Sequence, residues 1–271
     1  MKISVGDIRL FVEISGPPLP PLLLMHGGPG ANHLRLKRDL AYLGQWFQLV
    51  LIDERGCGQS DKSPEATLTV AQNVADMEAV RTALGLEKIS VLGWSYGGML
   101  AAAYAAKYAD RLNLLFLLST AGSGDFLRSS AEWLRQYGTP EQQREGLRSL
   151  RCETVPPAQL QRHVAVLNRL NQRRVMPALP VTWNAAALRI GIRKDLPRWN
   201  VLPQLRRVKV PTFIAVGRRD WICPVDQSLA LKQVMPHADL HIYDRAAHYP
   251  ATDAPRRFRR DIAKFITRHE N

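Results

Sequence analysis

A serine between two glycines is the residue of this chain whose setting most clearly indicates chemistry. Residues 93–97 spell GWSYG, a G-x-S-x-G pattern with Ser95 at its centre. An apolar run at residues 89–92 precedes it, and an alanine-rich helical stretch at 99–108 follows. The glycines permit a sharp turn from strand to helix that holds the hydroxyl at a helix N-terminus, where negative charge is favoured. We therefore predict that Ser95 is a nucleophile and not only a structural turn.

A serine hydroxyl attacks only when a base removes its proton and an acid orients that base. In chains with this kind of turn the order is serine, acid, histidine, and the last two follow late strands. Asp220 and His248 each come shortly after a late strand-like run. We predict that they complete a set with Ser95, and Asp125 is the alternative acid.

Negative charge that develops on the substrate oxygen needs backbone N–H donors. One donor should be Tyr96, the residue after the nucleophile. The other should come from the glycine-rich residues 26–30, where Gly28 is our preferred donor and Gly27 the next choice. We also expect Gly27 and Trp94 to border the bound substrate.

Two neighbouring groups are expected to support this site. Residues 53–60, DERGCGQS, follow a strand, and we expect their side chains to hydrogen-bond adjacent loops. His26 is expected to hold the glycine loop by hydrogen bonding, and Cys57 to pack nearby without reacting, because no base is assigned to it. The chemistry needs no metal and no cofactor, so we predict neither.

The elements that must position these residues are strands alternating with helices. Helical spacing is visible at residues 69–84, which end at Gly85, and a closing helix is predicted at 256–268. Buried runs separated by amphipathic helices imply a parallel sheet with helices on both faces. Seven apolar runs are typical of strands: residues 8–14, 21–25, 47–52, 89–92, 112–118, 212–216 and 240–243.

Residues 122–199 have a different pattern. They contain no strand-like run, and prolines interrupt helical stretches at residues 130–137, 158–170 and 183–192. We predict one α/β catalytic domain made of residues 1–121 and 200–271, with a helical cap of residues 122–199 inserted after the sixth strand.

The charge balance is strongly basic, with 37 Lys and Arg against 24 Asp and Glu, a net charge of +13 and a pI near 10.1. Such a charge suggests nucleic acid, but no zinc-finger, RNA-binding or basic-region pattern accompanies it. We therefore expect a small-molecule or short-peptide substrate, no nucleic acid and no membrane partner. The sequence leaves the oligomeric state open.

Several features favour a cytoplasmic location. The first fifteen residues lack the basic start and apolar stretch of a signal peptide. The longest apolar runs are far shorter than the roughly 20 residues that span a bilayer. An odd count of three cysteines without regular spacing predicts neither a disulfide framework nor a zinc site: Cys57, Cys152 and Cys223.

Four motifs together make the chain resemble the prolyl iminopeptidases, which are serine aminopeptidases of the α/β-hydrolase fold. They are HGGPG at 26–30, DERGCGQS at 53–60, GWSYGG at 93–98 and GRRDWICP at 217–224. The first two together are fairly specific to that group and its close esterase relatives.

The resemblance implies a mostly parallel eight-stranded sheet flanked by helices. It also implies release of N-terminal proline, or another small residue, through an acyl-enzyme. The residues implied are Ser95, Asp220 and His248 as catalytic triad, and Gly28 and Tyr96 as donors of the oxyanion hole.

The cap departs from that family. Prolyl iminopeptidases bind the substrate amine with acidic side chains, one of which follows tryptophans in a W-x-x-W-E-like stretch; the nearest counterpart, residues 183–186, has no glutamate. Residues 154–198 carry eight basic side chains and one acid, Asp195. Other carboxylates that could bind an amine are Glu54, Glu132, Glu141, Glu145 and Glu153.

Three hypotheses follow from these observations. The first is an iminopeptidase-like serine hydrolase. The second is a carboxylesterase or lactonase on the same scaffold, since a basic cap suits neutral or anionic acyl groups. The third is a non-catalytic binding protein or a nucleic-acid binder, against which the intact set of serine, acid and histidine argues.

Overall fold

A computed structural model describes residues 1–174, 176–177 and 179–269 of the chain. Its centre is a sheet with the strand order β1-β2-β4-β3-β5-β6-β7-β8. β1 and β2 run antiparallel to their neighbours, and the other pairs are parallel. The strands are β1 (Lys2–Val5), β2 (Ile8–Ser15), β3 (Pro21–Met25), β4 (Gln48–Ile52), β5 (Ile89–Trp94), β6 (Leu112–Leu118), β7 (Thr212–Gly217) and β8 (Asp239–Tyr243).

The seven predicted strands are all present, with ends within two residues of those expected. The inner strands are apolar along their length because helices cover both of their faces; every residue of β7 is buried. β1 was not among the predicted runs. It is an edge strand of four residues, of which only Val5 is buried, so its sequence carries little apolar signal.

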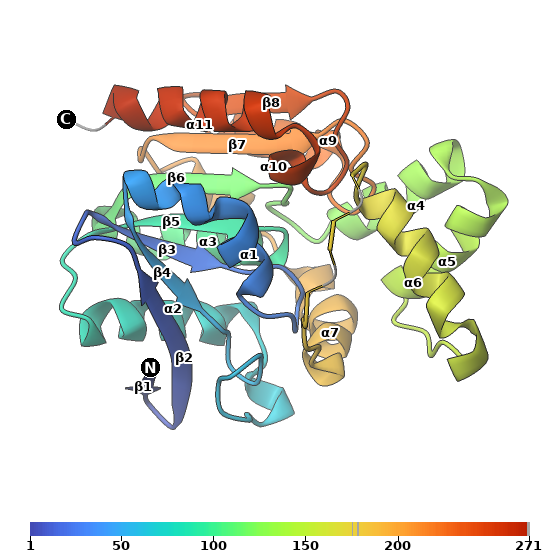
Figure 1. Ribbon diagram of the computed structural model, residues 1–271, viewed down its shortest axis with the longest axis horizontal. Coiled ribbons are helices and arrows are strands. Elements are labelled where there is room, and N and C mark those ends of the chain that lie inside the picture. The colour runs from blue at the N-terminus through green and yellow to red at the C-terminus, as the bar shows by residue number, and fades with distance from the viewer. Residues whose placement is uncertain (175, 178, 270–271) are drawn as a thin grey trace.

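Helices pack on the two faces of the sheet (Figure 1). One apolar cluster joins the sheet to α2 (Val70–Ala83), α3 (Tyr96–Tyr108), α8 (Leu202–Leu205) and α9 (Val225–Val234). A second cluster on the opposite face joins it to α1 (Leu34–Leu40) and α11 (Pro255–His269). α10 (Pro250–Asp253) lies directly before α11, and short turns of helix are found at Ala41–Gln45, Glu65–Thr67 and Ala109–Arg111.

Between β6 and β7 the chain forms the segment of residues 122–199, which we call the cap segment. Its helices α4 to α6 project to one side of the sheet, and α7 lies closer to it (Figure 1). α5 was not predicted, although Thr139 and Gln142 form a capping box at its start, a recognisable sequence signal. The helices are α4 (Phe126–Tyr137), α5 (Pro140–Leu150), α6 (Pro157–Asn171), α7 (Ala185–Ile190), a π-helical turn (Gly191–Asp195) and a final turn (Leu196–Arg198).

The two ends of the cap segment are hydrogen-bonded to each other. The amide of Gly124 donates to the carbonyl of Trp199 at 2.8 Å, and that of Val201 to Gly122 at 2.9 Å. These bonds form a small antiparallel bridge between Ser123 and Asn200. Within the described residues, no helix has the length and apolar character needed to cross a membrane.

Candidate active site

Ser95 occupies a strained turn between β5 and α3. Its φ is +58°, a value that non-glycine residues seldom adopt and that is often found at functional sites. Its amide donates to the Leu118 carbonyl at 2.9 Å, and its carbonyl accepts from Thr120 Oγ1 at 2.7 Å. A Cβ on Gly97 would collide with the main chain of Met25, so only glycine allows this approach. The turn therefore holds Ser95 rigidly at the carboxyl end of the sheet.

The structure brings Ser95, His248 and Asp220 together in a hydrogen-bond relay. His248 Nε2 lies 2.9 Å from Ser95 Oγ, and His248 Nδ1 lies 2.8 Å from Asp220 Oδ2. All three residues are buried. A carboxylate that accepts from Nδ1–H leaves Nε2 free to accept the serine proton, so this arrangement can activate the hydroxyl.

The loop after β7 fixes the carboxylate. Asp220 Oδ1 accepts from the amides of Ile222 and Cys223 at 2.9 and 3.0 Å. The alternative acid lies elsewhere: Asp125 accepts from Ser123 Oγ at 3.1 Å, and its side chain is 66% exposed. The geometry therefore favours Asp220 as the acid that orients His248.

The glycine loop after β3 presents unused backbone donors. Gly28 has φ +148°, and among the described residues the amides of Gly28 and Tyr96 have no hydrogen-bond acceptor. His26 anchors the loop, because its Nδ1 donates to the Gly27 carbonyl at 2.8 Å and its Nε2 accepts from the Glu54 amide at 3.3 Å. Free amides beside an activated serine are what an oxyanion hole requires.

Trp94 packs between the glycine loop and the loop that carries His248. Its Nε1 donates to the His248 carbonyl at 3.0 Å, and its ring centroid lies 4.6 Å from that of Tyr249. A Cβ on Gly27 would meet the Trp94 ring at 2.5 Å. These contacts give both residues a packing role, while substrate contact by Gly27 and Trp94 stays a prediction.

A buried carboxyl lies under the glycine loop. Glu54 is 3% exposed, and its Oε1 has no hydrogen-bond partner among the described residues. Burial and the charge of Asp53 raise the pKa of Glu54 well above its ordinary value. Burial lowers the pKa of His26, whose Nδ1 is 3.5 Å from Glu54 Oε1. Both groups therefore favour their neutral forms.

His26, Glu54 and Cys57 bring possible ligand atoms within 4.8 Å of one another. Both His26 nitrogens are already hydrogen-bonded to the main chain, and burial raises the pKa of the Cys57 thiol, which opposes the thiolate that a metal needs. The cluster therefore does not suit a metal ion, and it is explained as packing beneath the loop.

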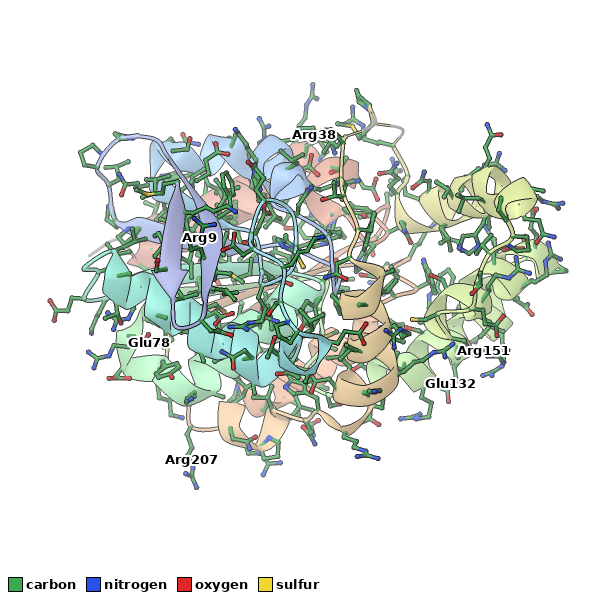
Figure 2. The ribbon with its side chains drawn as sticks, turned by 90° about the horizontal axis from the view of Figure 1, so that it is seen from below. Arg9, Arg38, Glu78, Glu132, Arg151 and Arg207 are labelled. Carbon is green, nitrogen blue, oxygen red and sulfur yellow. The ribbon has the colours of Figure 1, made fainter. Side chains whose placement is uncertain are left out.

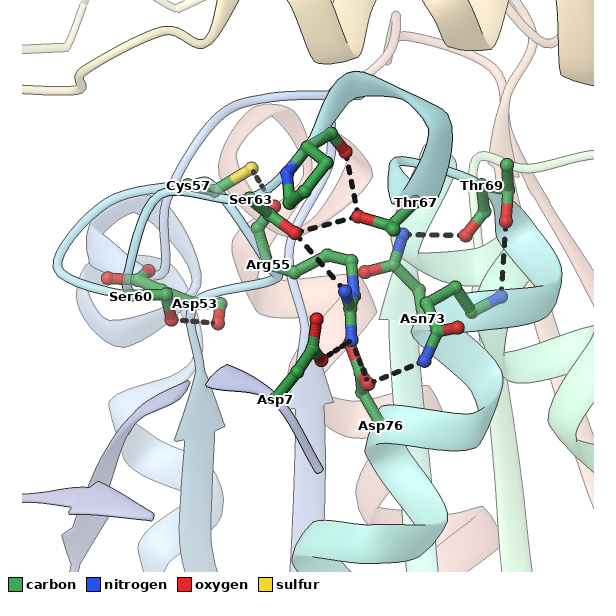
Figure 3. Close-up of polar contacts among 12 residues, drawn as sticks. Asp7, Asp53, Arg55, Cys57, Ser60, Ser63, Thr67, Thr69, Asn73 and Asp76 are labelled. Carbon is green, nitrogen blue, oxygen red and sulfur yellow. Dashed lines mark hydrogen bonds and ion pairs between the residues drawn. The ribbon is translucent and has the colours of Figure 1, made fainter. Parts of the chain in front are cut away.

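The loop of residues 53–60 is braced by an ion pair (Figure 3). Arg55 Nε and Nη2 each donate to Asp76 of α2 at 2.7 Å, and Arg55 Nη1 to Ser63 at 3.2 Å. Ser60 Oγ donates to the Asp53 carbonyl at 2.6 Å. As expected from the sequence, these side chains hold neighbouring loops in place.

Two asparagines of the cap segment contact the site loops, and sequence reasoning missed both. The Asn171 carbonyl accepts from the His248 amide at 2.9 Å, and its Oδ1 from Trp221 Nε1 at 2.7 Å. Asn184 donates its amide to the Gly30 carbonyl at 2.8 Å and its Nδ2 to the Gly56 carbonyl at 2.9 Å. For Asn184 the sequence carries one signal, its helix-capping position just before α7. For Asn171 it carries none.

The acidic side chains of the cap segment have partners within the chain. The buried Glu145 accepts from His163 Nδ1 at 2.8 Å and from Arg148 at 3.1 Å. Asp195 accepts from the Val70 amide at the start of α2 at 2.7 Å. The remaining pairs are Glu132 with Arg128, Glu141 with Arg162, and Glu153 with Arg151.

Comparison with known proteins places this geometry among hydrolases. Residues 20–255 match the family model of the alpha/beta hydrolase fold. The chain is 28% identical over 265 residues to the proline iminopeptidase PfmaB of Pestalotiopsis fici, covering 91% of this chain and 92% of that protein.

A second relative carries a different name. The chain is 26% identical over 271 residues to a 2-hydroxy-6-oxononadienedioate/2-hydroxy-6-oxononatrienedioate hydrolase of Burkholderia vietnamiensis, covering 97% of this chain and 92% of that protein. Among solved structures, a Mycobacterium smegmatis proline iminopeptidase superposes with a TM-score of 0.82 at 23% identity, over 99% of this chain and 98% of that one.

Proposed function

Because the chain belongs to the α/β-hydrolase fold family, we propose that this hydrolase acts through an acyl-enzyme formed on Ser95. The observation that carries the proposal is the hydrogen-bond relay from Asp220 through His248 to Ser95. His248 takes the hydroxyl proton as Ser95 attacks the carbonyl carbon, and then gives it to the leaving group. A water molecule then attacks the acyl carbon while His248 takes its proton. The bond to Ser95 Oγ breaks, the acid leaves, and His248 returns the proton to Oγ.

The tetrahedral intermediates of both steps carry a negative oxygen. The Tyr96 and Gly28 amides would donate to it, with the Gly27 amide as the alternative to Gly28. Asp220 would keep the His248 ring in the tautomer that accepts the serine proton, and would stabilise the imidazolium that forms.

Labelling with a fluorophosphonate probe tests the nucleophile. We expect wild-type protein to be labelled and Ser95→Ala to be unlabelled, with kcat/KM lower by roughly 10⁴-fold or more. Ser149→Ala, at the end of α5, is the matched control and should be labelled like wild type. Unlabelled wild-type protein would favour a binding protein over an enzyme.

For the substrate, we propose an N-terminal prolyl amide as the first candidate. It is supported by the four motifs and by a relative named proline iminopeptidase. Glu54 does not supply the carboxylate for the substrate amine, because it is 3% exposed and burial raises its pKa.

The second candidate is an ester or lactone whose acyl part is neutral or anionic. It is favoured by the ion pairs that occupy the cap carboxylates, because a substrate ammonium group would have to compete with arginine for them. The relative from Burkholderia vietnamiensis is named for a dioate, which is a dicarboxylate.

Proline naphthylamide and nitrophenyl acetate, assayed side by side on purified protein, separate the two candidates. If only proline naphthylamide is turned over, and its turnover is lost when the proline is N-acetylated, the iminopeptidase is supported. Turnover of esters with the amide untouched supports the second candidate and overturns the first.

A further inference from the structure

A cavity lies beside the loop that carries Asp220, and among the described residues neither Ser95 nor His248 lines it. It has a volume of about 730 Å³, a size typical of small-molecule sites. Its walls come from α4, from the end of α6 and from the loop between β7 and α9. The cavity is therefore a groove between the cap segment and the loop at the carboxyl end of β7.

Four arginines line this groove: Arg169 near the end of α6, Arg173 just after that helix, and Arg218 and Arg219 in the loop after β7. Arg218 pairs with Asp244 at 2.6 Å. Within residues 1–174, 176–177 and 179–269, the other three guanidinium groups have no side-chain hydrogen bond and no ion pair. By contrast, Arg162 and Arg189, elsewhere on the cap segment, have carboxylate partners at 2.6 and 2.9 Å.

Two acids also line the groove, and both have partners of their own. Glu132, on the cap segment (Figure 2), accepts from Arg128 at 3.4 Å. Asp226 Oδ2 accepts from Ser129 Oγ at 2.7 Å and from Gln227 Nε2 at 2.8 Å. The groove thus keeps a positive excess, and guanidinium groups bind phosphate and carboxylate through paired N–H donors.

Aromatic rings form another wall. Trp133 and Tyr137 of α4 lie with ring centroids 5.3 Å apart. Trp133 packs on the apolar cluster that contains Leu170, whereas Tyr137 is 62% exposed. An exposed ring beside a rigid one offers a stacking surface for a flat group of a ligand.

We propose that this groove is a second binding site, which takes an anion with at least two negative charges and a flat ring, such as a nucleoside diphosphate. The charged end contacts Arg169, Arg173 and Arg219, and the ring stacks on Tyr137. The proposal is independent of the reaction at Ser95.

A ligand in this position bridges the two halves of the molecule near the relay. Arg219 directly precedes Asp220 in the chain. Arg173 follows two residues after Asn171, whose carbonyl accepts from the His248 amide. A bound anion would therefore fasten the end of α6 to the loop that carries Asp220, and binding should raise the melting temperature.

Isothermal titration calorimetry with ADP on the full-length protein tests the site, with adenosine and pyrophosphate as the separate halves of the probe. We expect ADP to bind more tightly than either half, and its affinity to fall as salt is raised. Arg169→Ala should weaken binding by about tenfold or more. Tyr137→Ala should weaken ADP binding and leave pyrophosphate binding unchanged.

Arg207→Ala is the matched control, because this exposed arginine lies away from the cap segment (Figure 2). It should bind ADP like wild type, and melting temperatures of all variants verify folding. The proposal is overturned if ADP does not bind at millimolar concentration, or if Arg207→Ala weakens it as much as Arg169→Ala. Adenosine binding as tightly as ADP overturns the role of the arginines, and pyrophosphate binding as tightly as ADP overturns that of the ring.

Discussion

The sheet and the cap segment place their charged side chains in opposite ways. Arg55, beside the sheet, has a side chain that is only 1% exposed and is held by Asp76 at 2.7 Å. Arg162 on the cap segment is 69% exposed, and its partner Glu141 is 36% exposed. The charged pair of Arg55 and Asp76 near the sheet is thus fixed in position, whereas the pair of Arg162 and Glu141 on the cap is solvated. The relay lies where side chains are fixed, as reacting groups require.

Asp220→Asn should have the largest effect, because it changes the buried relay near the sheet. An amide can force the wrong His248 tautomer, so we expect kcat/KM to fall by roughly 10⁴-fold while the melting temperature changes little. Steady-state kinetics measures it. Asp125→Asn is the control and should retain activity; a loss equal to that of Asp220→Asn would make Asp125 the orienting acid.

Arg55→Ala should cost about 3–5 kcal/mol in the free energy of unfolding, because it leaves the buried Asp76 carboxylate without its partner. Arg189→Ala on the cap breaks an exposed pair with Glu65 and should cost at most about 1 kcal/mol. Urea denaturation compares the two. Equal losses would contradict the contrast between the fixed and the solvated charges.

Glu54→Gln should change how stability depends on pH. The folded-state pKa of Glu54 is raised by burial and by Asp53. The contribution of Glu54 to the free energy of unfolding is therefore complete below the unfolded-state pKa of about 4.3. It is lost as the pH rises through the higher pKa of the folded state. Relative to wild type, the melting temperature of the variant should increase from pH 4 upward.

Thermal melts between pH 4 and 9 measure that difference. The exposed Glu87, changed to Gln, is the control for removing a carboxyl that is not buried. A difference for Glu54→Gln that does not change with pH would mean that this carboxyl titrates as it does in the unfolded chain.

Asn184→Ala affects the contact between the two regions and should have a smaller effect than Arg55→Ala. It removes the cap of α7 and the bond to Gly56, so we expect a loss of about 1–2 kcal/mol. Asn184→Asp keeps the cap and removes only the donor to Gly56. If limited proteolysis cuts the cap segment equally fast in both variants, the Gly56 bond holds the cap; protection in the aspartate variant alone assigns the effect to helix capping.

Much of the sheet and the position of the relay could be predicted from the sequence because both depend on local patterns. Ser95 lies between a buried strand and a helix, and Asp220 and His248 follow late strands, in the chain order that accompanies this kind of turn. These signals span a few residues each.

The remaining features depend on contacts between distant residues. Arg55 and Asp76 are 21 residues apart, and Asn184 reaches Gly56 across 128 residues. No local pattern marks such pairs. Composition also could not show which arginines of the cap segment have a partner. Whether an arginine pairs with an acid, donates to a carbonyl or lines a groove depends on how the segment packs.

The bridge between Ser123 and Asn200 means that the cap segment begins and ends at the same place. Because the two ends of the cap segment already meet, a chain of different length can leave and re-enter the sheet at this point without moving β6 or β7, and loop length itself costs little. An exchange of the cap segment at this junction would leave the strands in place, but it would also replace the contacts that Asn171 and Asn184 make with the His248 loop and the glycine loop.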